Sequence, residues 1–133
     1  MGLQTDITMP WADGTYRFHL DIPRLAELQE KCQAGPPEVL GRLSSGRARL
    51  EDWRETIRLG LIGGGAPPAE ALRLVERYVD TRPQMEALGV ALVVLGAALL
   101  GHDPETAPAG KRKRARSRTT AASTSPASEP TPS

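Results

Sequence analysis

The sequence predicts a mainly α-helical domain of the α+β class: an N-terminal β-hairpin packed on a small bundle of about four to five helices, followed by a disordered C-terminal tail. Strict alternation of apolar and polar residues occurs only near the N-terminus. Between residues 22 and 100, apolar residues recur every three or four positions, with Gly and Pro at the breaks. No large apolar residue follows Leu100. We therefore expect a helical domain over residues 1–102 and a disordered basic tail, rich in Ser, Thr and Pro, over residues 103–133.

Two runs that alternate in polarity predict the hairpin. Their apolar residues are Ile7, Met9 and Trp11 in the first run and Tyr16, Phe18 and Leu20 in the second. Between them, residues 12–14 read Ala-Asp-Gly, and Asp-Gly is a common hairpin turn. Because an isolated two-stranded hairpin is barely stable, its apolar face is expected to lie on helices.

Helical spacing begins at Asp21. This residue is a suitable N-cap, and Pro23 falls in the first turn, where its missing N–H does no harm. The apolar stripe that follows is Ile22, Leu25, Leu28 and Cys32. Residues 34–37, Ala-Gly-Pro-Pro, end this helix, and a short second helix is expected over residues 37–43.

The third helix has the clearest amphipathic pattern. Its apolar stripe is Leu50, Trp53, Ile57 and Leu61. Gly63-Gly64-Gly65 is expected to end the helix, because glycine accepts the left-handed conformation that many helix ends need.

Two further helices are predicted before residue 102. Pro67-Pro68 opens the first, whose stripe is Leu72, Val75 and Val79. Residues 81–84, Thr-Arg-Pro-Gln, have the spacing of a capping box and open the last helix, over residues 83–100. This last helix is apolar nearly all round, so it is expected either to be central to the core or to be covered by a partner.

No catalytic, cofactor or metal site is expected, and the protein is not expected to be an enzyme. The only histidines are His19, expected on a strand surface, and His102, expected to cap a helix end. The single cysteine, Cys32, excludes an intrachain disulfide and a cysteine-rich zinc site, and is expected to be a small buried hydrophobe. The run Gly60 to Gly65 is not a phosphate-binding loop, because it follows a helix and precedes two prolines.

Composition also predicts the surroundings of the protein. Residues 1–10 lack the basic and apolar regions of a secretory signal. The longest apolar run, residues 87–101, has 15 residues, which is shorter than the roughly 18–20 needed to span a bilayer. We expect a soluble protein of a reducing compartment, with no membrane partner.

The net charge of +1 is the sum over two segments of the chain with opposite net charges. Residues 1–110 have 11 Lys and Arg against 15 Asp and Glu, whereas residues 111–133 have six basic residues and one acid. The basic residues are Lys111, Arg112, Lys113, Arg114, Arg116 and Arg118. Such a run contacts phosphate backbones without reading bases, and no aromatic residue is interleaved for stacking. The alternative function is therefore a small nucleic-acid-associated protein that acts through this tail, with weak and non-specific binding.

Surplus apolar residues indicate a protein partner or self-association. Leu59 and Ile62 lie off the main stripe of the third helix, while Val93 and Val94 enlarge the apolar surface of the last helix. These four residues are the candidate partner surface, and Leu59 is the position most expected to be exposed. The alternative is that all of them meet inside one core.

Several stretches of the sequence, in order, carry a family resemblance. Residues 25–30 (LAELQE), 35–36 (GP) and 39–43 (VLGRL) come first, and residues 55–65 (ETIRLGLIGGG) follow. The specific part of the last stretch is Ile57, Arg58, Leu59, Gly60, Leu61, Ile62, Gly63, Gly64 and Gly65. Together with the Ala/Leu-rich last helix, these stretches resemble the gene transfer agent family of phage tail proteins, over about residues 7–102.

The resemblance implies a tail assembly chaperone of a siphophage-like particle, a prophage or a gene transfer agent. Such proteins coat the long, helical, apolar tape measure protein before the tail tube polymerises around it, and they are absent from the finished particle. The implied partners are therefore the tape measure protein and other tail proteins, in the cytoplasm of a bacterial host cell. The family does not explain the basic tail after His102.

Overall fold

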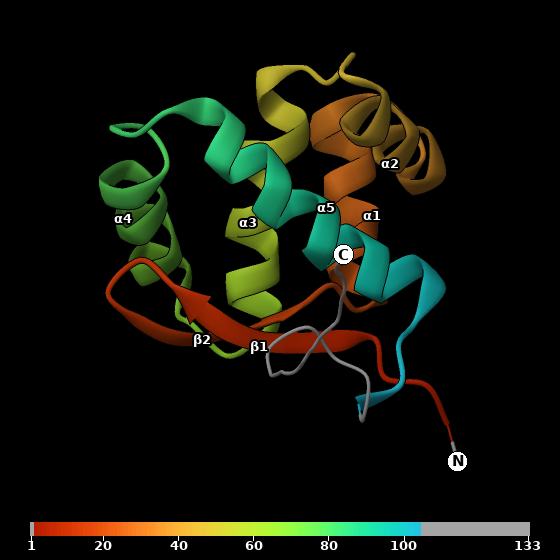
Figure 1. The fold of residues 1–133 in the computed structure, drawn as a ribbon, viewed down its shortest axis with the longest axis horizontal. Coiled ribbons are helices and arrows are strands. Elements are labelled where there is room, and N and C mark those ends of the chain that lie inside the picture. Colours follow the sequence, from red (N-terminus) through yellow and green to blue (C-terminus); the bar gives the residue numbers. More distant parts are fainter. Residues whose placement is uncertain (1, 105–133) are drawn as a thin grey trace, which may run out of the picture. The chain divides into compact units, whose positions relative to one another are not determined.

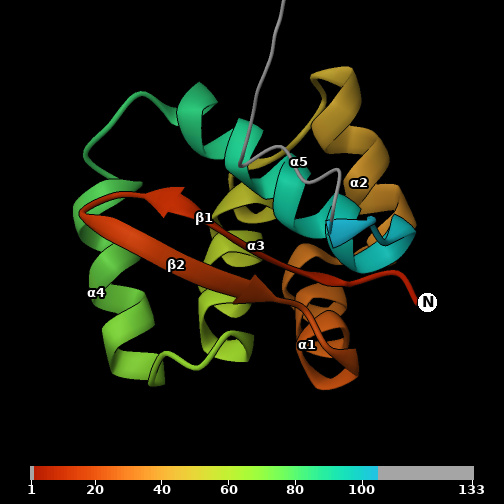
Figure 2. The ribbon, with the colours of Figure 1, turned by 60° about the horizontal axis from the view of Figure 1, so that its bottom comes forward.

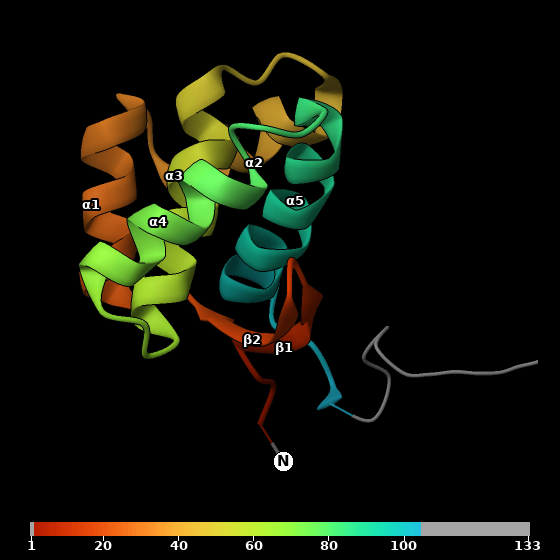
Figure 3. The same cartoon turned by 90° about the vertical axis from the view of Figure 1, so that its left-hand side faces the viewer.

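Two antiparallel strands and five helices make up residues 2–104, the part of the chain that the computed structural model describes (Figure 1). The elements are β1 (Asp6–Trp11), β2 (Gly14–His19), α1 (Ile22–Cys32), α2 (Pro36–Ser45), α3 (Leu50–Gly63), α4 (Pro68–Tyr78) and α5 (Gln84–Leu100). The helices lie together, and the hairpin lies beneath them (Figure 3). The predicted fold class is therefore confirmed for these residues, while the predicted disorder of the tail concerns residues outside the described part.

The hairpin lies across α3 and also contacts α5 (Figure 2). Ile7 pairs with Phe18 in the ladder, and both side chains are buried against the helices. Gly14 still belongs to the ladder, so the turn consists of Ala12 and Asp13, with Ala12 at a φ of 56°. The turn therefore lies within the predicted stretch of residues 12–14, but it excludes Gly14.

Helix α3 is the centre of the fold. It packs against α1, α4, α5 and strand β2. Ile57 and Leu61 of the predicted stripe are buried, but so is Leu59 on another side of the helix. Leu50, at the first position of α3, is exposed because the helix begins beyond the core. A helix with neighbours on several sides buries more than one stripe.

Ile22 and Leu72 of the predicted stripes are also exposed, as is Met85 in α5. Ile22 and Met85 lie at the first and second positions of α1 and α5, so their side chains project past the packed part of each helix. Leu72 is exposed because α4 is rotated relative to the prediction. The side of α4 that faces the core carries Ala71, Leu74 and Val75.

The helix ends follow the predicted chemistry only in part. The Asp21 carboxylate accepts a hydrogen bond from the Arg24 backbone N–H at 3.1 Å, as a side-chain N-cap does. At the start of α5 there is no capping box, since Pro83 is the N-cap and lacks a capping side chain. The side chain of Gln84 instead accepts from Trp53 Nε1 at 2.9 Å. Helix α2 extends two residues beyond the predicted end at residue 43 and starts one residue earlier.

The two ends of the helical unit are joined by backbone pairing. The Gln4 N–H donates to the His102 carbonyl, and the His102 N–H donates to the Gln4 carbonyl, each at 2.9 Å. His102 Nε2 also lies 2.7 Å from the Asp6 carbonyl oxygen. The prediction that His102 caps α5 is therefore wrong, because the C-cap is Gly101 and His102 binds the N-terminal segment.

Candidate functional site

Exposed apolar side chains gather on one side of α5. Met85 is 70% exposed, Val93 37% and Leu100 72%. Leu92 is half-buried, and Gly89 and Gly96 lie between Met85 and Leu100 in the chain. In Figure 1 this helix crosses the near side of the fold, in front of α3 and α1. We define the outer face of α5 as Met85, Gly89, Leu92, Val93, Gly96 and Leu100.

The outer face is almost free of charge. Glu86 is the only charged residue in α5. At the other end of the helix, Leu3 is exposed and extends the apolar surface, because it lies beside Gly101. Within residues 2–104, the remaining exposed large apolar residues belong to three other helices, one on each, and are Ile22, Leu50 and Leu72. Single exposed apolar residues are common, whereas a continuous patch is typical of a docking surface.

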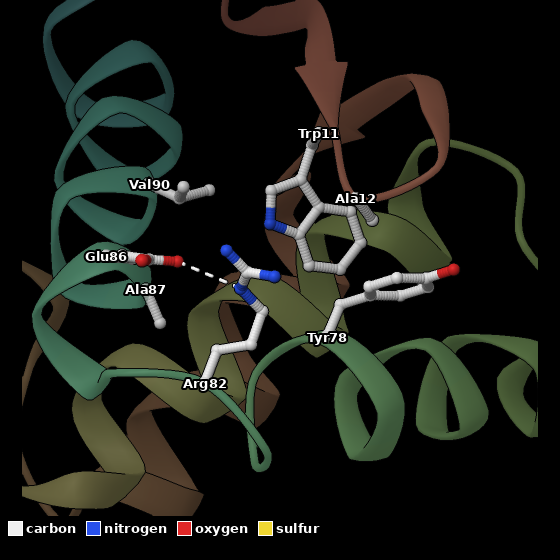
Figure 4. Close-up of a pocket in the computed structure, with 7 residues that line it drawn as sticks. All are labelled: Trp11, Ala12, Tyr78, Arg82, Glu86, Ala87 and Val90. Carbon is white, nitrogen blue, oxygen red and sulfur yellow. Dashed lines mark hydrogen bonds and ion pairs between the residues drawn. The ribbon is translucent and has the colours of Figure 1, made fainter.

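A small cavity borders the N-terminal end of this face (Figure 4). Its volume is about 230 Å³, and its lining residues are Trp11, Ala12, Tyr78, Arg82, Glu86, Ala87 and Val90. Arg82 Nε donates to Glu86 Oε1 at 3.0 Å. The indole nitrogen of Trp11 and the other guanidinium nitrogens of Arg82 point toward one another (Figure 4). Small-molecule sites usually exceed about 300 Å³, so this cavity is better suited to a side chain of a protein partner.

The glycines of the family signature serve internal packing. A Cβ atom on Gly63 would lie 1.8 Å from the carbonyl oxygen of His19, and one on Gly64 would lie 1.9 Å from that of Arg17. Only Gly65 has a positive φ, of 119°. The predicted left-handed conformation therefore explains Gly65 alone, while Gly63 and Gly64 allow the end of α3 to approach strand β2 closely.

The polar residue of the signature, Arg58, joins two helices. Its Nη2 atom lies 2.6 Å from the Glu55 carboxylate in α3 and 3.5 Å from the Glu27 carboxylate in α1. Burial disfavours the charged guanidinium, but the hydrogen bonds and charges of the two carboxylates outweigh burial and raise the pKa of Arg58. Arg58 therefore holds the packing of α1 on α3.

The structure separates the four residues of the candidate partner surface. Leu59 and Val94 are buried in the core, so the expectation that Leu59 is exposed is wrong. Leu59 is covered because α3 has neighbours on several sides. Ile62 is half-buried, and Val93 alone is exposed, on the outer face of α5. Sequence reasoning missed Gly89 and Gly96 as members of this face, as well as Trp11 and the cavity.

The other candidate groups lie apart from this face. Cys32 is fully buried, and burial together with the nearby charge of Asp52 raises the pKa of its thiol to about 12. Within residues 2–104, no group of three or more His, Cys, Asp or Glu side chains is placed to hold a metal ion. The basic residues Lys111 to Arg118 lie outside the described residues, so their contact with nucleic acid stays a prediction.

Comparisons with known proteins agree with the sequence resemblance. No helix in the described part of the chain is both long and apolar enough to cross a membrane. No curated protein and no solved structure was found to match the chain. A family model described as "Phage tail tube protein, GTA-gp10" matches residues 4–101, which include both strands and all five helices described above. The chain therefore belongs to this family of phage tail and gene transfer agent proteins.

Proposed function

We propose that the protein is a non-catalytic assembly chaperone of a phage-like tail, which holds the tape measure protein before the tail tube forms around it. The observation that carries this proposal is the uncharged, apolar outer face of α5. Such a face binds a partner by burying apolar area and needs no reacting groups. The proposed place of action is the cytoplasm of the bacterial host cell.

The dimensions of the outer face suit a helical partner. Helix α5 has 17 residues, which corresponds to a length of roughly 25 Å. The outer face is one helix wide, and its six positions follow one another at steps of four, three, one, three and four residues. An amphipathic helix of the partner can lie along such a strip, so that the partner's apolar side chains pack between those of the outer face. A long helical protein would then be coated by many copies, each covering a short segment.

The family description favours a second candidate, a subunit of the tail tube itself. A subunit that polymerises head to tail must bury two different surfaces, one against each neighbour. Within residues 2–104, however, the exposed large apolar residues gather mainly on α5 and the adjacent Leu3. A single such surface favours the chaperone. Detection of the protein in stoichiometric amounts in purified mature particles by mass spectrometry would support the tube subunit instead.

Co-expression with the tape measure protein of the same locus tests the proposal. The Met85→Glu variant is expected to lower co-purification at least tenfold, because it places a charge on the outer face. Ile22→Glu is the matched control: Ile22 is 77% exposed against 70% for Met85, and both residues lie in the first turn of a helix. Both variants should keep the native circular dichroism spectrum. Failure of the native protein to co-purify, together with tails of normal length after deletion of the gene, would contradict the proposal.

A further inference from the structure

We infer that the outer face of α5 also pairs with the same face of a second copy of this chain, with the two helices antiparallel about a twofold axis. The biological meaning of this pairing rests on the proposed function, because the same face is the proposed partner site. Pairing covers the apolar face until the partner takes the place of the second copy. The physical argument and its test require neither the tape measure protein nor an assembled particle.

Two glycines on the outer face have no explanation within a single copy. A Cβ atom on Gly89 or Gly96 meets nothing within 4 Å, and neither residue has a positive φ. Glycine in the middle of a helix costs about 0.5–1 kcal/mol relative to alanine. A Cβ atom on Gly63, in contrast, would lie 1.8 Å from the carbonyl oxygen of His19, so glycine is required there. The two outer glycines leave room for another backbone to approach α5 closely.

The outer face has the same order of large and small residues in both directions. From either end it presents a large residue, a glycine, the pair Leu92-Val93, a glycine and a large residue, at matching spacings. When two copies of α5 pair antiparallel, Met85 faces Leu100 of the second copy and Gly89 faces Gly96 of the second copy. A twofold interface needs this kind of self-complementarity, whereas binding to a different protein does not.

The charges on α5 permit the pairing. A twofold axis duplicates every charge of a surface, so a charged face often repels its own copy. Residues 87–101 contain no charged residue, and Glu86 at the edge is already paired with Arg82 at 3.0 Å. Antiparallel pairing also places the positive end of each helix dipole beside the negative end of the other.

The size of the face makes the pair reversible. A strip roughly 25 Å long and about 10 Å wide covers a few hundred Å², against about 800 Å² per partner in a stable interface. A weak dimer can dissociate when the partner protein binds to the same face. The chain's own tail is a poor alternative occupant, because residues 105–133 contain no Leu, Ile, Val, Met, Phe, Tyr or Trp.

Sedimentation velocity over a wide range of protein concentration tests the pairing with the full chain. The native protein should change reversibly from monomer to dimer, and Gly89→Lys should weaken the association at least tenfold. Gly41→Lys is the matched control, because Gly41 also lies inside a helix and a Cβ there meets nothing within 4 Å. A native protein that stays monomeric at every concentration, or equal weakening by both variants, would overturn the inference.

Disulfide cross-linking tests the antiparallel orientation. Two copies of residue 93 lie next to the twofold axis, so Val93→Cys should form a disulfide-linked dimer on mild oxidation. Two copies of residue 85 would lie roughly 22 Å apart along the helices, so Met85→Cys should not, although Met85 is the more exposed residue. Equal cross-linking of both variants would contradict the antiparallel arrangement. Loss of tape measure binding alone would contradict the proposed function and leave this result unaffected.

Discussion

Gly63 at the end of α3 lies against the backbone of His19 at the end of β2, so closely that a Cβ atom on Gly63 would be 1.8 Å from the His19 carbonyl oxygen. The obstacle is backbone in a paired strand, which cannot move aside as a flexible side chain does. This contact joins the central helix to the hairpin. The glycine-rich signature of the family is therefore a requirement of the fold.

Gly63→Ala should destabilise the protein by about 3 kcal/mol or more, because the added methyl group forces α3 away from β2. Gly41→Ala in α2 should instead stabilise it by about 0.5–1 kcal/mol, since its Cβ would meet nothing within 4 Å. Urea denaturation followed by circular dichroism measures both changes. Similar effects of the two substitutions would show that the close approach does not exist.

A fully buried carboxylate joins α2 to the start of α3. Asp52 accepts from Arg42 Nε at 2.9 Å and Nη2 at 2.8 Å, and from the Arg49 backbone N–H at 2.8 Å. Asp52→Asn should lower the free energy of unfolding by about 3 kcal/mol or more, because it removes the buried charge that pairs with Arg42 and leaves only the exposed Glu38 carboxylate, at 3.5 Å, as its anionic partner. Glu51→Gln, at the adjacent exposed position, is the control and should change stability by less than about 0.5 kcal/mol.

The same carboxylate gives the stability a definite pH dependence. Burial alone would raise the pKa of Asp52, but the hydrogen bonds from Arg42 and from the Arg49 backbone outweigh burial and hold the pKa below its ordinary value. Asp52 therefore stabilises the fold fully above about pH 4 and loses this effect as the pH falls through the lowered pKa. Urea titrations from pH 7 to pH 3 should show a smaller decline for Asp52→Asn than for the native protein. Parallel declines would contradict this assignment.

The thiol of Cys32 should be unreactive in the folded protein. Burial, aided by the nearby charge of Asp52, raises its pKa to about 12, so almost no thiolate exists at pH 8. Ellman's reagent should therefore react slowly with the native protein and rapidly in urea, with a rate that follows the fraction unfolded. Rapid reaction without denaturant would contradict the burial of Cys32 and would also complicate the cross-linking experiment.

Gln84 holds the start of α5 against α3. Its side chain accepts from Trp53 Nε1 at 2.9 Å and donates to the Val79 carbonyl at 2.7 Å. Gln84→Met should cost about 1–3 kcal/mol of stability, because Trp53 Nε1 loses its hydrogen-bond acceptor and the Val79 carbonyl keeps only the Arg82 backbone N–H. The exposed Gln29 provides the control substitution Gln29→Met, which should be nearly neutral. Urea denaturation monitored by tryptophan fluorescence distinguishes the two.

The strands and helices were predictable because each is marked by local sequence: alternation in the hairpin, regular apolar spacing in the helices, and Gly or Pro at the breaks. Burial was less predictable, because periodicity assumes a single buried side. That assumption failed for α3, where Ile57 and Leu59 are both buried. Periodicity also did not indicate which side of α5 is buried, because this helix is apolar nearly all round. Val93 and Val94 are adjacent in sequence, yet only Val93 is exposed, because consecutive helix residues point about 100° apart.

The candidate site was only partly accessible to sequence reasoning. Surplus apolar residues in the last helix correctly pointed to that helix as a place with uncovered surface. Gly89 and Gly96 gave no signal, since only the structure shows that nothing packs against them. Trp11 of the hairpin and Arg82, which precedes α5 in the chain, line the same cavity. No local sequence pattern relates residues so far apart in the chain.

The pairing of Gln4 with His102 has a consequence for synthesis on the ribosome. Gln4 cannot take up its native backbone hydrogen bonds until His102, almost one hundred residues later, has left the exit tunnel. Until α5 has emerged, the nascent hairpin also lacks one of the helices that it contacts. Folding of residues 4–102 is therefore completed only after His102 has emerged. A chain truncated within α5 would leave the hairpin without part of the helix that packs against it.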